Sequence, residues 1–343
     1  MSDPSNREEG LGFSRTLNTL TARLAPLLKA DGIHVTTVTP FKESFELDLE
    51  GVKENIGFLL ETEISSVVPL GTVGEFASLT KEERKRVTEL VVDAVNGKKT
   101  TIVGVSHTSF AEVVELAKHA KDCGADAVLL VPPYYYRDRD DGLVSFFELI
   151  SKSVDIDMVL YNVPGLSKVN LTGALLSKIL DRAENIVAIK DATKDLTQLA
   201  DTIRTIGKRV PVIAGAEEIS YFGLLAGSPG ATSAMANFAP NLVVDMYRAI
   251  KKNDIPTASS IFFEKILLFR HLDVAAVLQG FPIQIVYVKE VMNLLGMHGG
   301  SVRPPLTQLT QEKKEELKRV LEVIGKSSTL GPLSMKQRVS REK

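Results

Sequence analysis

The segment SFAEVVELAKHAKDCGADAVLLV, residues 109–131, contains the structural unit from which this chain is built. Its first part has apolar residues at the helical period and ends at Gly124, a residue type that often terminates helices. Its last part, Ala127–Val131, is an unbroken apolar run of strand length. The segment therefore predicts an amphipathic helix followed by a buried strand.

The same alternation of helix and strand begins at residue 32 and continues to about residue 253. The predicted strands are Ile33–Val38, Ser66–Pro69, Thr101–Val105, Ala127–Val131, Met158–Tyr161, Ile186–Lys190, Val212–Ala214 and Ala231–Ala234. Strands that alternate with helices form a parallel sheet covered by those helices, and eight such units match a closed (β/α)8 TIM barrel of the α/β class. A doubly wound open sheet is the alternative, but it needs a glycine-rich turn after the first strand, and residues 37–45 (TVTPFKESF) contain none.

Segments at both ends extend this predicted barrel, which we assign to residues 31–253. Helical patterns at 255–270, 283–296 and 310–325 predict a C-terminal helical appendix over residues 254–325, and residues 326–343 form a polar tail. Residues 1–30 form an N-terminal extension with leucines at helical spacing. We interpret it as a surface helix; an amphipathic transit segment for import into an organelle is the alternative.

The composition excludes several classes of protein. The net charge is −2 without a basic stripe, which argues against a nucleic-acid partner. No apolar run is long enough to cross a bilayer, so we expect no membrane partner. The single cysteine, Cys123, forms no intrachain disulfide and fits a reducing compartment, so we expect a cytoplasmic protein.

Lys190 ends an apolar strand in the stretch NIVAIKDAT, residues 185–193. Side chains alternate along a strand, so Ile186, Ala188 and Lys190 share one face, and Val187 and Ile189 share the other. The branched pair suits the helix-covered face, which turns Lys190 into the mouth of the barrel. Partial removal from water favours a neutral amine, which attacks a ketone to form a Schiff base. The alternatives are a lysine at an exposed strand end, or one paired with Asp191.

Two further features lie at the ends of other predicted strands. Tyr161 ends the preceding strand and would relay a proton near Lys190, although a structural tyrosine is the alternative. The loop Gly71–Thr72–Val73–Gly74 has backbone N–H groups that would hold a carboxylate, beside the Thr72 hydroxyl. Such a GxxG pattern is also common in ordinary turns.

The metal-ligating residue types are scattered. The histidines (34, 107, 119, 271 and 298) form no pair at ligand spacing, and the cysteine stands alone. We therefore expect no metal and no cofactor, and an aldolase built on this chain would use its lysine.

The combination of GTVGEFASLT, PPYYY, YNVPG and AIKDAT, in this order, resembles the dihydrodipicolinate synthase / N-acetylneuraminate lyase family of pyruvate-dependent class I aldolases. The resemblance covers roughly residues 31–325. It implies a TIM barrel assembled as a homo-oligomer, a dimer or tetramer, that acts on pyruvate and an aldehyde. It implies that Lys190 forms the Schiff base, and that Tyr161 relays protons together with Thr72 and Tyr135. In some members the equivalent of Tyr135 reaches across a subunit interface. The amides of Thr72 and Val73 would hold the pyruvate carboxylate.

Two positions depart from the family pattern. Many members carry a second threonine at the position of Val73. Dihydrodipicolinate synthases carry an arginine for the carboxylate of aspartate semialdehyde at the position of Leu166, and Lys168 nearby need not replace its two-pronged fork. We therefore expect first a lyase that cleaves or forms a 2-keto-3-deoxy acid, and second a 4-hydroxy-tetrahydrodipicolinate synthase. A non-catalytic keto-acid-binding barrel and a dehydratase of the same family are the remaining alternatives.

Overall fold

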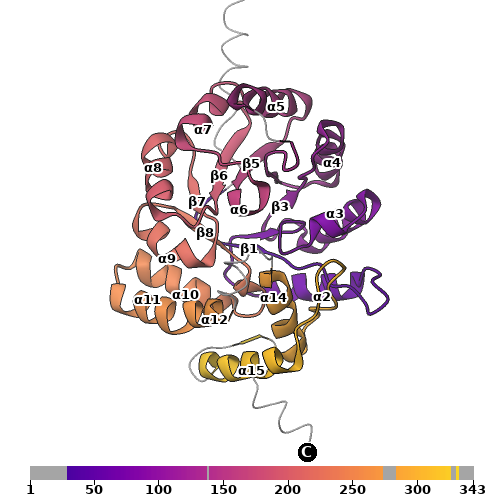
Figure 1. Ribbon diagram of the computed structural model, residues 1–343, viewed down its shortest axis with the longest axis vertical. Coiled ribbons are helices and arrows are strands. Elements are labelled where there is room, and N and C mark those ends of the chain that lie inside the picture. Colours follow the sequence, from indigo (N-terminus) through magenta and orange to yellow (C-terminus); the bar gives the residue numbers. More distant parts are fainter. Residues whose placement is uncertain (1–28, 137–138, 273–282, 326–329, 332–343) are drawn as a thin grey trace, which may run out of the picture.

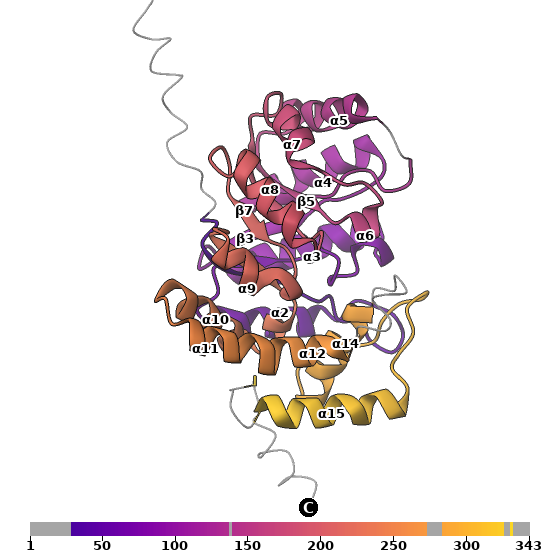
Figure 2. The ribbon, with the colours of Figure 1, turned by 60° about the vertical axis from the view of Figure 1, so that its left-hand side comes forward.

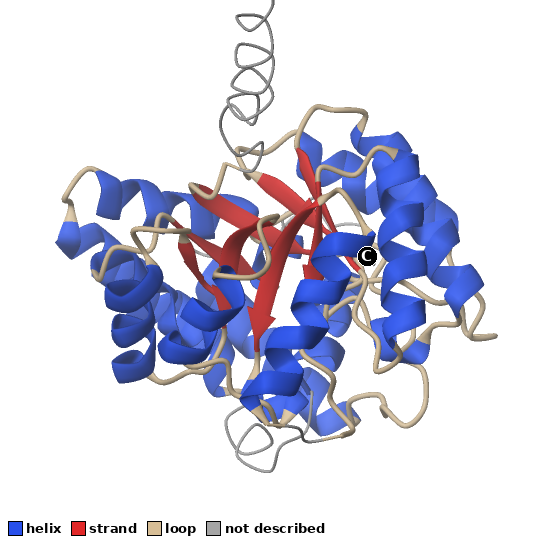
Figure 3. Ribbon diagram, turned by 90° about the horizontal axis from the view of Figure 1, so that it is seen from above, coloured by secondary structure: helices blue, strands red, loops and turns tan. Residues whose placement is uncertain are grey.

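The computed structural model describes residues 29–136, 139–272, 283–325 and 330–331, and within them the strands close into a barrel. All eight strands are parallel, in the order β1 to β8, and β8 pairs with β1 through Gly32–Gly230 and Val35–Ser233. In Figures 1 and 3 the strands occupy the centre and the helices surround them. The predicted (β/α)8 barrel is confirmed, and the alternative of an open sheet is wrong.

Each predicted strand is present with ends that differ from the prediction by at most two residues. The strands are β1 Gly32–Thr36, β2 Ser66–Val68, β3 Thr100–Gly104, β4 Ala127–Leu130, β5 Asp157–Asn162, β6 Ile186–Asp191, β7 Val212–Ala214 and β8 Gly230–Ser233.

The helices of the outer layer begin and end at residues that suit those positions. Thr80 forms a capping box with Glu83 at the start of α3, and Gly124 ends α4 with a φ of 93°, in the left-handed region. The outer helices are α2 Leu49–Leu60, α3 Lys81–Val95, α4 Phe110–Cys123, α5 Asp140–Ser153, α7 Gly173–Leu180, α8 Leu196–Ile206, α9 Glu217–Leu225 and α10 Pro240–Lys251.

Short helices also follow strands where the sequence suggested only loops. They are η1 Phe76–Ser78 after β2, α6 Pro164–Ser167 after β5 and η2 Met235–Asn237 after β8. All three lie just after the carboxyl ends of their strands, the side of the barrel at which TIM-barrel enzymes carry their active sites.

The expected C-terminal helical appendix is present. It comprises α11 Ile255–Ile261, a π-helical segment Phe262–Ile266, α12 Leu267–His271, α14 Ile283–Leu294 and α15 Gln311–Gly325. In Figure 2, α14 lies between α15 and the barrel, and buried residues of both helices belong to the main core. The helix expected within residues 1–30 falls on residues 1–28, which lie outside the described residues, as does most of the tail.

Two of the three buried clusters lie on opposite faces of the closed sheet, and the third is a small one formed by Ile285, Val286 and Val302. The larger of the two opposite clusters lies between strands and helices, and contains Val35, Leu160 and Ile189. The smaller fills the lumen, and contains Leu129, Val159 and Ala188. Strands buried on both faces read as continuous apolar runs, which explains the sequence pattern. No helix in the described ranges is long and apolar enough to cross a membrane.

Candidate active site

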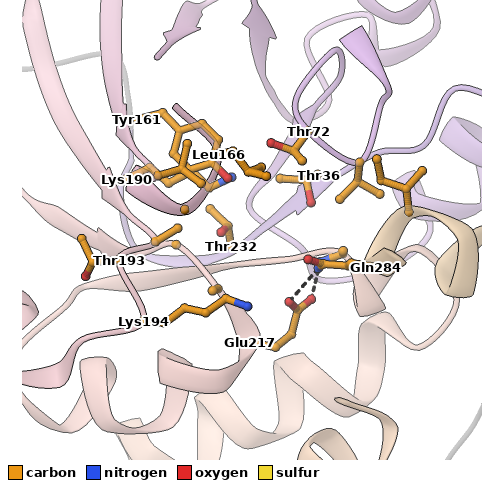
Figure 4. A pocket seen from close by; sticks show the side chains of 18 of the residues that line it. Thr36, Thr72, Tyr161, Leu166, Lys190, Thr193, Lys194, Glu217, Thr232 and Gln284 are labelled. Carbon is orange, nitrogen blue, oxygen red and sulfur yellow. Dashed lines mark hydrogen bonds between the residues drawn. The ribbon is translucent and has the colours of Figure 1, made fainter. Parts of the chain in front are cut away.

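A cavity of about 230 Å³ opens at the carboxyl ends of the strands, and Lys190 and Tyr161 lie in its wall. Figure 4 shows both side chains beside Thr72, Thr36 and Leu166. The loop after β2 and the ends of β5 and β6, distant in sequence, are thus brought together in one site. This is the side of the barrel at which TIM-barrel enzymes carry their catalytic residues.

Lys190 is buried, with 4% of its surface exposed, so it does not mark an exposed strand end. Its Nζ lies 3.8 Å from the centroid of the Tyr161 ring, because the two residues are paired directly in the β5–β6 ladder. Asp191 faces elsewhere: its carboxylate accepts hydrogen bonds from the backbone N–H and the hydroxyl of Thr193 at 3.0 and 2.7 Å. Burial raises the pKa of that carboxyl. The alternative of a Lys190–Asp191 pair is therefore wrong.

The predicted alternation along β6 is correct only at its end. Ala188 belongs to the lumen and Ile189 to the outer core, but Ile186 lies in the outer core and Val187 packs against the lumen cluster. The β5–β6 register shifts at this point, where Met158 pairs with Ile186 and the next pair skips Val187. A bulge inserts one residue and exchanges the faces. Lys190, beyond the bulge, still points into the lumen.

The loop after β2 contributes two of its four predicted residues to the cavity wall, Thr72 and Val73. Gly74 has a packing role instead, because a Cβ there would lie 2.9 Å from the backbone N of Leu70. Gly71 has space around it and is also not part of the wall. Gly74 thus lets the loop pack closely against Leu70 while Thr72 and Val73 face the cavity.

Tyr135 lies apart from this cavity within the described chain. It is 80% exposed and stacks edge-on with Tyr136, which is 77% exposed. Its neighbour Tyr134 packs on Phe76 and lines a second, mostly apolar cavity of about 280 Å³ that shares Thr72 with the first. Tyr135 therefore reaches no other predicted site residue of its own chain.

The end of β7 supplies a carboxylate that the sequence analysis missed. Glu217 is buried and lines the cavity; its Oε1 accepts hydrogen bonds from Met235 N at 2.9 Å and Ser233 Oγ at 3.1 Å. Its Oε2 accepts one from Gln284 Nε2 at 3.2 Å (Figure 4). The signal in the sequence is the run AGAEE, residues 214–218, at the end of this strand.

A second missed group lies beside it. Glu218 accepts hydrogen bonds from Lys194 at 2.8 Å and Arg270 at 2.6 Å, and both cations line the cavity. Burial alone would raise the pKa of Glu218, but the two cations hold it at about 2. This side of the cavity is polar and charged, whereas Leu166 and Val163 form an apolar side.

The lumen below the site also contains a small group of polar, uncharged side chains among its apolar ones. The ring of His34 bonds to the Ser66 hydroxyl at 2.7 Å and to the Ala30 carbonyl at 3.0 Å. Burial lowers the pKa of His34, against the opposing effect of its hydrogen bond to Ala30, and favours the neutral ring.

Comparison with known proteins agrees with this geometry. The chain matches the Dihydrodipicolinate synthetase family over residues 29–324. It is 38% identical over 291 residues to the 4-hydroxy-tetrahydrodipicolinate synthase of Methanothrix thermoacetophila. The aligned residues make up 84% of this chain and 95% of that protein. The synthase of the same name from Methanopyrus kandleri is 36% identical over 296 residues, covering 86% and 96%.

Solved structures lead to the same family. A prophage protein of the dihydrodipicolinic acid synthase family from E. coli K12, crystallised with pyruvate, superposes with a TM-score of 0.80 at 30% identity, covering 86% of this chain and 98% of that one. The expected resemblance is confirmed, and with it the expectation of a carbon–carbon lyase. The chain belongs to the dihydrodipicolinate synthetase family.

Proposed function

We propose that this protein is a Schiff-base-forming aldolase that joins pyruvate to an aldehyde. The observation that carries the proposal is the buried Lys190 amine, 3.8 Å from the Tyr161 ring centroid, in a cavity that Thr72 also lines. Among the described residues no carboxylate forms an ion pair with this amine, and a buried amine of this kind is suited to act as a nucleophile rather than as a structural cation.

The proposed reaction begins when the Lys190 amine attacks the keto carbon of pyruvate. Loss of water gives a protonated imine, which draws electrons from the methyl group as a proton leaves, forming an enamine. The enamine carbon attacks the aldehyde carbonyl, whose oxygen takes up a proton, and hydrolysis of the new imine frees the amine. Tyr161 moves protons between the substrates and solvent, and the Thr72–Val73 loop holds the carboxylate.

For the aldehyde, we propose aspartate semialdehyde, which makes the protein a 4-hydroxy-tetrahydrodipicolinate synthase. The relatives that are 32–38% identical to this chain over 84–86% of its length carry that name, which supports this alternative over the sugar-acid lyase ranked first from sequence. Both candidate reactions pass through the same imine on Lys190, so they differ only in the aldehyde that reacts with the enamine.

One observation favours the second candidate, cleavage of a 2-keto-3-deoxy acid. Leu166 is 44% exposed and lines the cavity where synthases are expected to carry an arginine. An arginine guanidinium can bind a carboxylate through two parallel hydrogen bonds, and the apolar side chain of leucine cannot. Polar groups at the opposite side of the cavity, Glu217 and Gln284, suit a hydroxylated chain.

The experiment has two parts. Incubation with pyruvate and borohydride, followed by peptide mass analysis, is expected to give one reduced adduct on Lys190. Rates of pyruvate consumption with aspartate semialdehyde and with glyceraldehyde then rank the acceptors. An unmodified protein would contradict the imine. An adduct without turnover of any aldehyde would favour the non-catalytic keto-acid-binding barrel.

Assembly and location belong to the same proposal. We propose a homo-oligomer in the cytoplasm in which Tyr135 completes the site of a neighbouring subunit. Its 80% exposure supports a role outside its own chain, since large aromatic side chains are enriched at interfaces. The apolar cavity beside Thr72, lined by Tyr134 and Phe76, offers such a side chain a position next to the proton relay.

A further inference from the structure

A buried ion pair connects the C-terminal appendix to the loop that lines the active site. Glu75, the last residue of the GTVGE loop, and Lys289, on α14, are 214 residues apart and form this pair. The Lys289 side chain is 2% exposed and that of Glu75 is 0% exposed. Ions are rarely buried so completely, because removing them from water is costly unless the geometry of the pair is well fixed.

Glu75 also shapes the loop through its backbone. Its N–H donates to the Thr72 carbonyl at 3.0 Å, which closes the turn that contains Val73 and Gly74. The residue has a φ of 53°, in the left-handed region that a non-glycine residue rarely adopts. Such a conformation persists when surrounding contacts fix it. The side-chain contacts of Glu75 are therefore placed to hold the turn that carries Thr72 and Val73.

Those contacts come from the C-terminal appendix and the segment that follows α14. Lys289 Nζ donates to Glu75 Oε1 and, at 2.8 Å, to the Ser301 carbonyl; it lies 4.3 Å from the centroid of the Phe41 ring. The Arg303 backbone N–H donates to the other carboxylate oxygen, Oε2, at 3.2 Å. Both oxygens of Glu75 are thus held from one side.

The guanidinium of Arg303 does not compete for this carboxylate. It binds Glu83 with Nη1 at 2.7 Å from Oε2 and Nη2 at 2.5 Å from Oε1, and Nη1 also donates to the Ser78 carbonyl at 2.8 Å. Each cation therefore has its own carboxylate, and Lys289 is the partner that balances the charge of Glu75. Burial lowers the pKa of Lys289 to about 8, against the opposing effect of Glu75.

We propose that Lys289 is a positioning residue for the aldolase reaction: through Glu75 it fixes the Thr72–Glu75 turn so that the loop binds the carboxylate of the keto acid. Lys289 does not line the cavity that holds Lys190, and this inference rests on the function proposed above. Active-site groups must be held within a fraction of an ångström of their productive positions. A rigid ion pair to a packed helix can hold the loop this precisely.

The test is borohydride trapping at graded pyruvate concentrations, with three variants. Lys289→Met removes the ammonium group. The double variant Glu75→Gln with Lys289→Met removes both charges and avoids leaving one buried and unpaired. Val291→Ala, a buried residue of the same helix, destabilises α14 without touching the pair. Melting temperatures of all variants accompany the trapping.

The expected result is that half-saturating pyruvate rises about 10- to 100-fold in both Lys289 variants, as when a charge-assisted hydrogen bond is lost. At saturating pyruvate the adduct on Lys190 should still form. The half-saturating pyruvate concentration of Val291→Ala should equal that of the protein without substitutions. Unchanged half-saturation in the double variant, or an equal rise in Val291→Ala, would overturn the inference alone. If the protein without substitutions forms no borohydride adduct at any pyruvate concentration, the proposed function is overturned, and this inference with it.

Discussion

Lys190 and Tyr161 face each other across adjacent strands, with the amine 3.8 Å from the centroid of the ring. The pairing is a property of the β5–β6 register rather than of flexible side chains. The ring of Tyr161 contacts the amine with its face, and its hydroxyl is then available for proton transfer. Ring and hydroxyl therefore make separable contributions.

Replacing the amine is expected to abolish the covalent path. Lys190→Ala should give no borohydride adduct and should lower the aldol rate by at least about 1,000-fold, as removal of a catalytic nucleophile typically does. The matched control is Lys194→Ala, a cavity lysine whose amine pairs with Glu218. It should be trapped as completely as the unmodified sequence. An adduct in Lys190→Ala would mean that another amine is the nucleophile.

Removing only the phenol hydroxyl should separate proton transfer from imine formation. Tyr161→Phe keeps the ring beneath Lys190, so the fold and the adduct at saturating pyruvate should persist, while kcat falls about 10²- to 10⁴-fold. Tyr221→Phe serves as control, because Tyr221 is also buried but stacks on Phe262 at 5.0 Å, outside the cavity wall. Steady-state rates and trapping yields measure both effects; a Tyr161→Phe enzyme with full kcat would exclude the relay.

The side chain at position 166 is expected to control the acceptor. Leu166→Arg should raise kcat/KM for aspartate semialdehyde by about 10-fold or more, because a guanidinium–carboxylate contact contributes on this scale. Leu166→Gln, which is polar but uncharged, should give little of this gain. The two variants are compared with aspartate semialdehyde and glyceraldehyde. If the protein with Leu166 already reacts well with aspartate semialdehyde, and Leu166→Arg lowers that activity, the carboxylate of this substrate is bound elsewhere.

Glu218 should make stability depend on pH in the acid range. Its folded pKa of about 2 is below the ordinary 4.5, so the folded state binds this proton less tightly than the unfolded state does. The stabilisation is complete above about pH 4.5 and is lost as the pH falls toward 2. The shift corresponds to at most about 3 kcal/mol, an upper limit because part of the side chain is exposed.

Urea unfolding at pH 7 and pH 3 tests this dependence. Glu218→Gln should lower the free energy of unfolding at pH 7 more than at pH 3. Asp201→Asn removes an exposed carboxylate that pairs with Arg204, and should change stability little at either pH. An equal loss for Glu218→Gln at both pH values would mean that its charge contributes nothing.

The apolar runs and helix signals were sufficient to predict the barrel, because local periodicity reflects which faces are buried. They could not reveal the bulge at Val187, since an inserted residue changes the faces without changing the composition of the strand. The faces at the start of β6 were therefore predicted wrongly. The face on which Lys190 lies was predicted correctly, because this residue lies beyond the bulge.

Long-range pairs were the other limit of the sequence. The strand ends predicted that Lys190, Tyr161 and Thr72 would lie near one another, and the three residues line one cavity. Nothing in the spacing of Glu75 and Lys289 indicates that they meet, because their contact depends on how α14 packs against the barrel. Glu217 was missed for a simpler reason, since the end of its strand carries an ordinary helix-start pattern of acidic residues.

The position of Tyr135 leads to a test of function between subunits. Tyr135→Phe and Lys190→Ala should each lower activity strongly if the site takes its third hydroxyl from a neighbour. In an equal mixture that exchanges subunits, about a quarter of the sites would combine an intact Lys190 with a partner's intact Tyr135, for a symmetric pairwise interface. Activity should therefore recover to about that fraction. The control mixes Lys190→Ala with Tyr161→Phe, both lesions in residues of one cavity, and should recover none. Equal recovery in both mixtures, or none in the first, would exclude a role for Tyr135 across the interface.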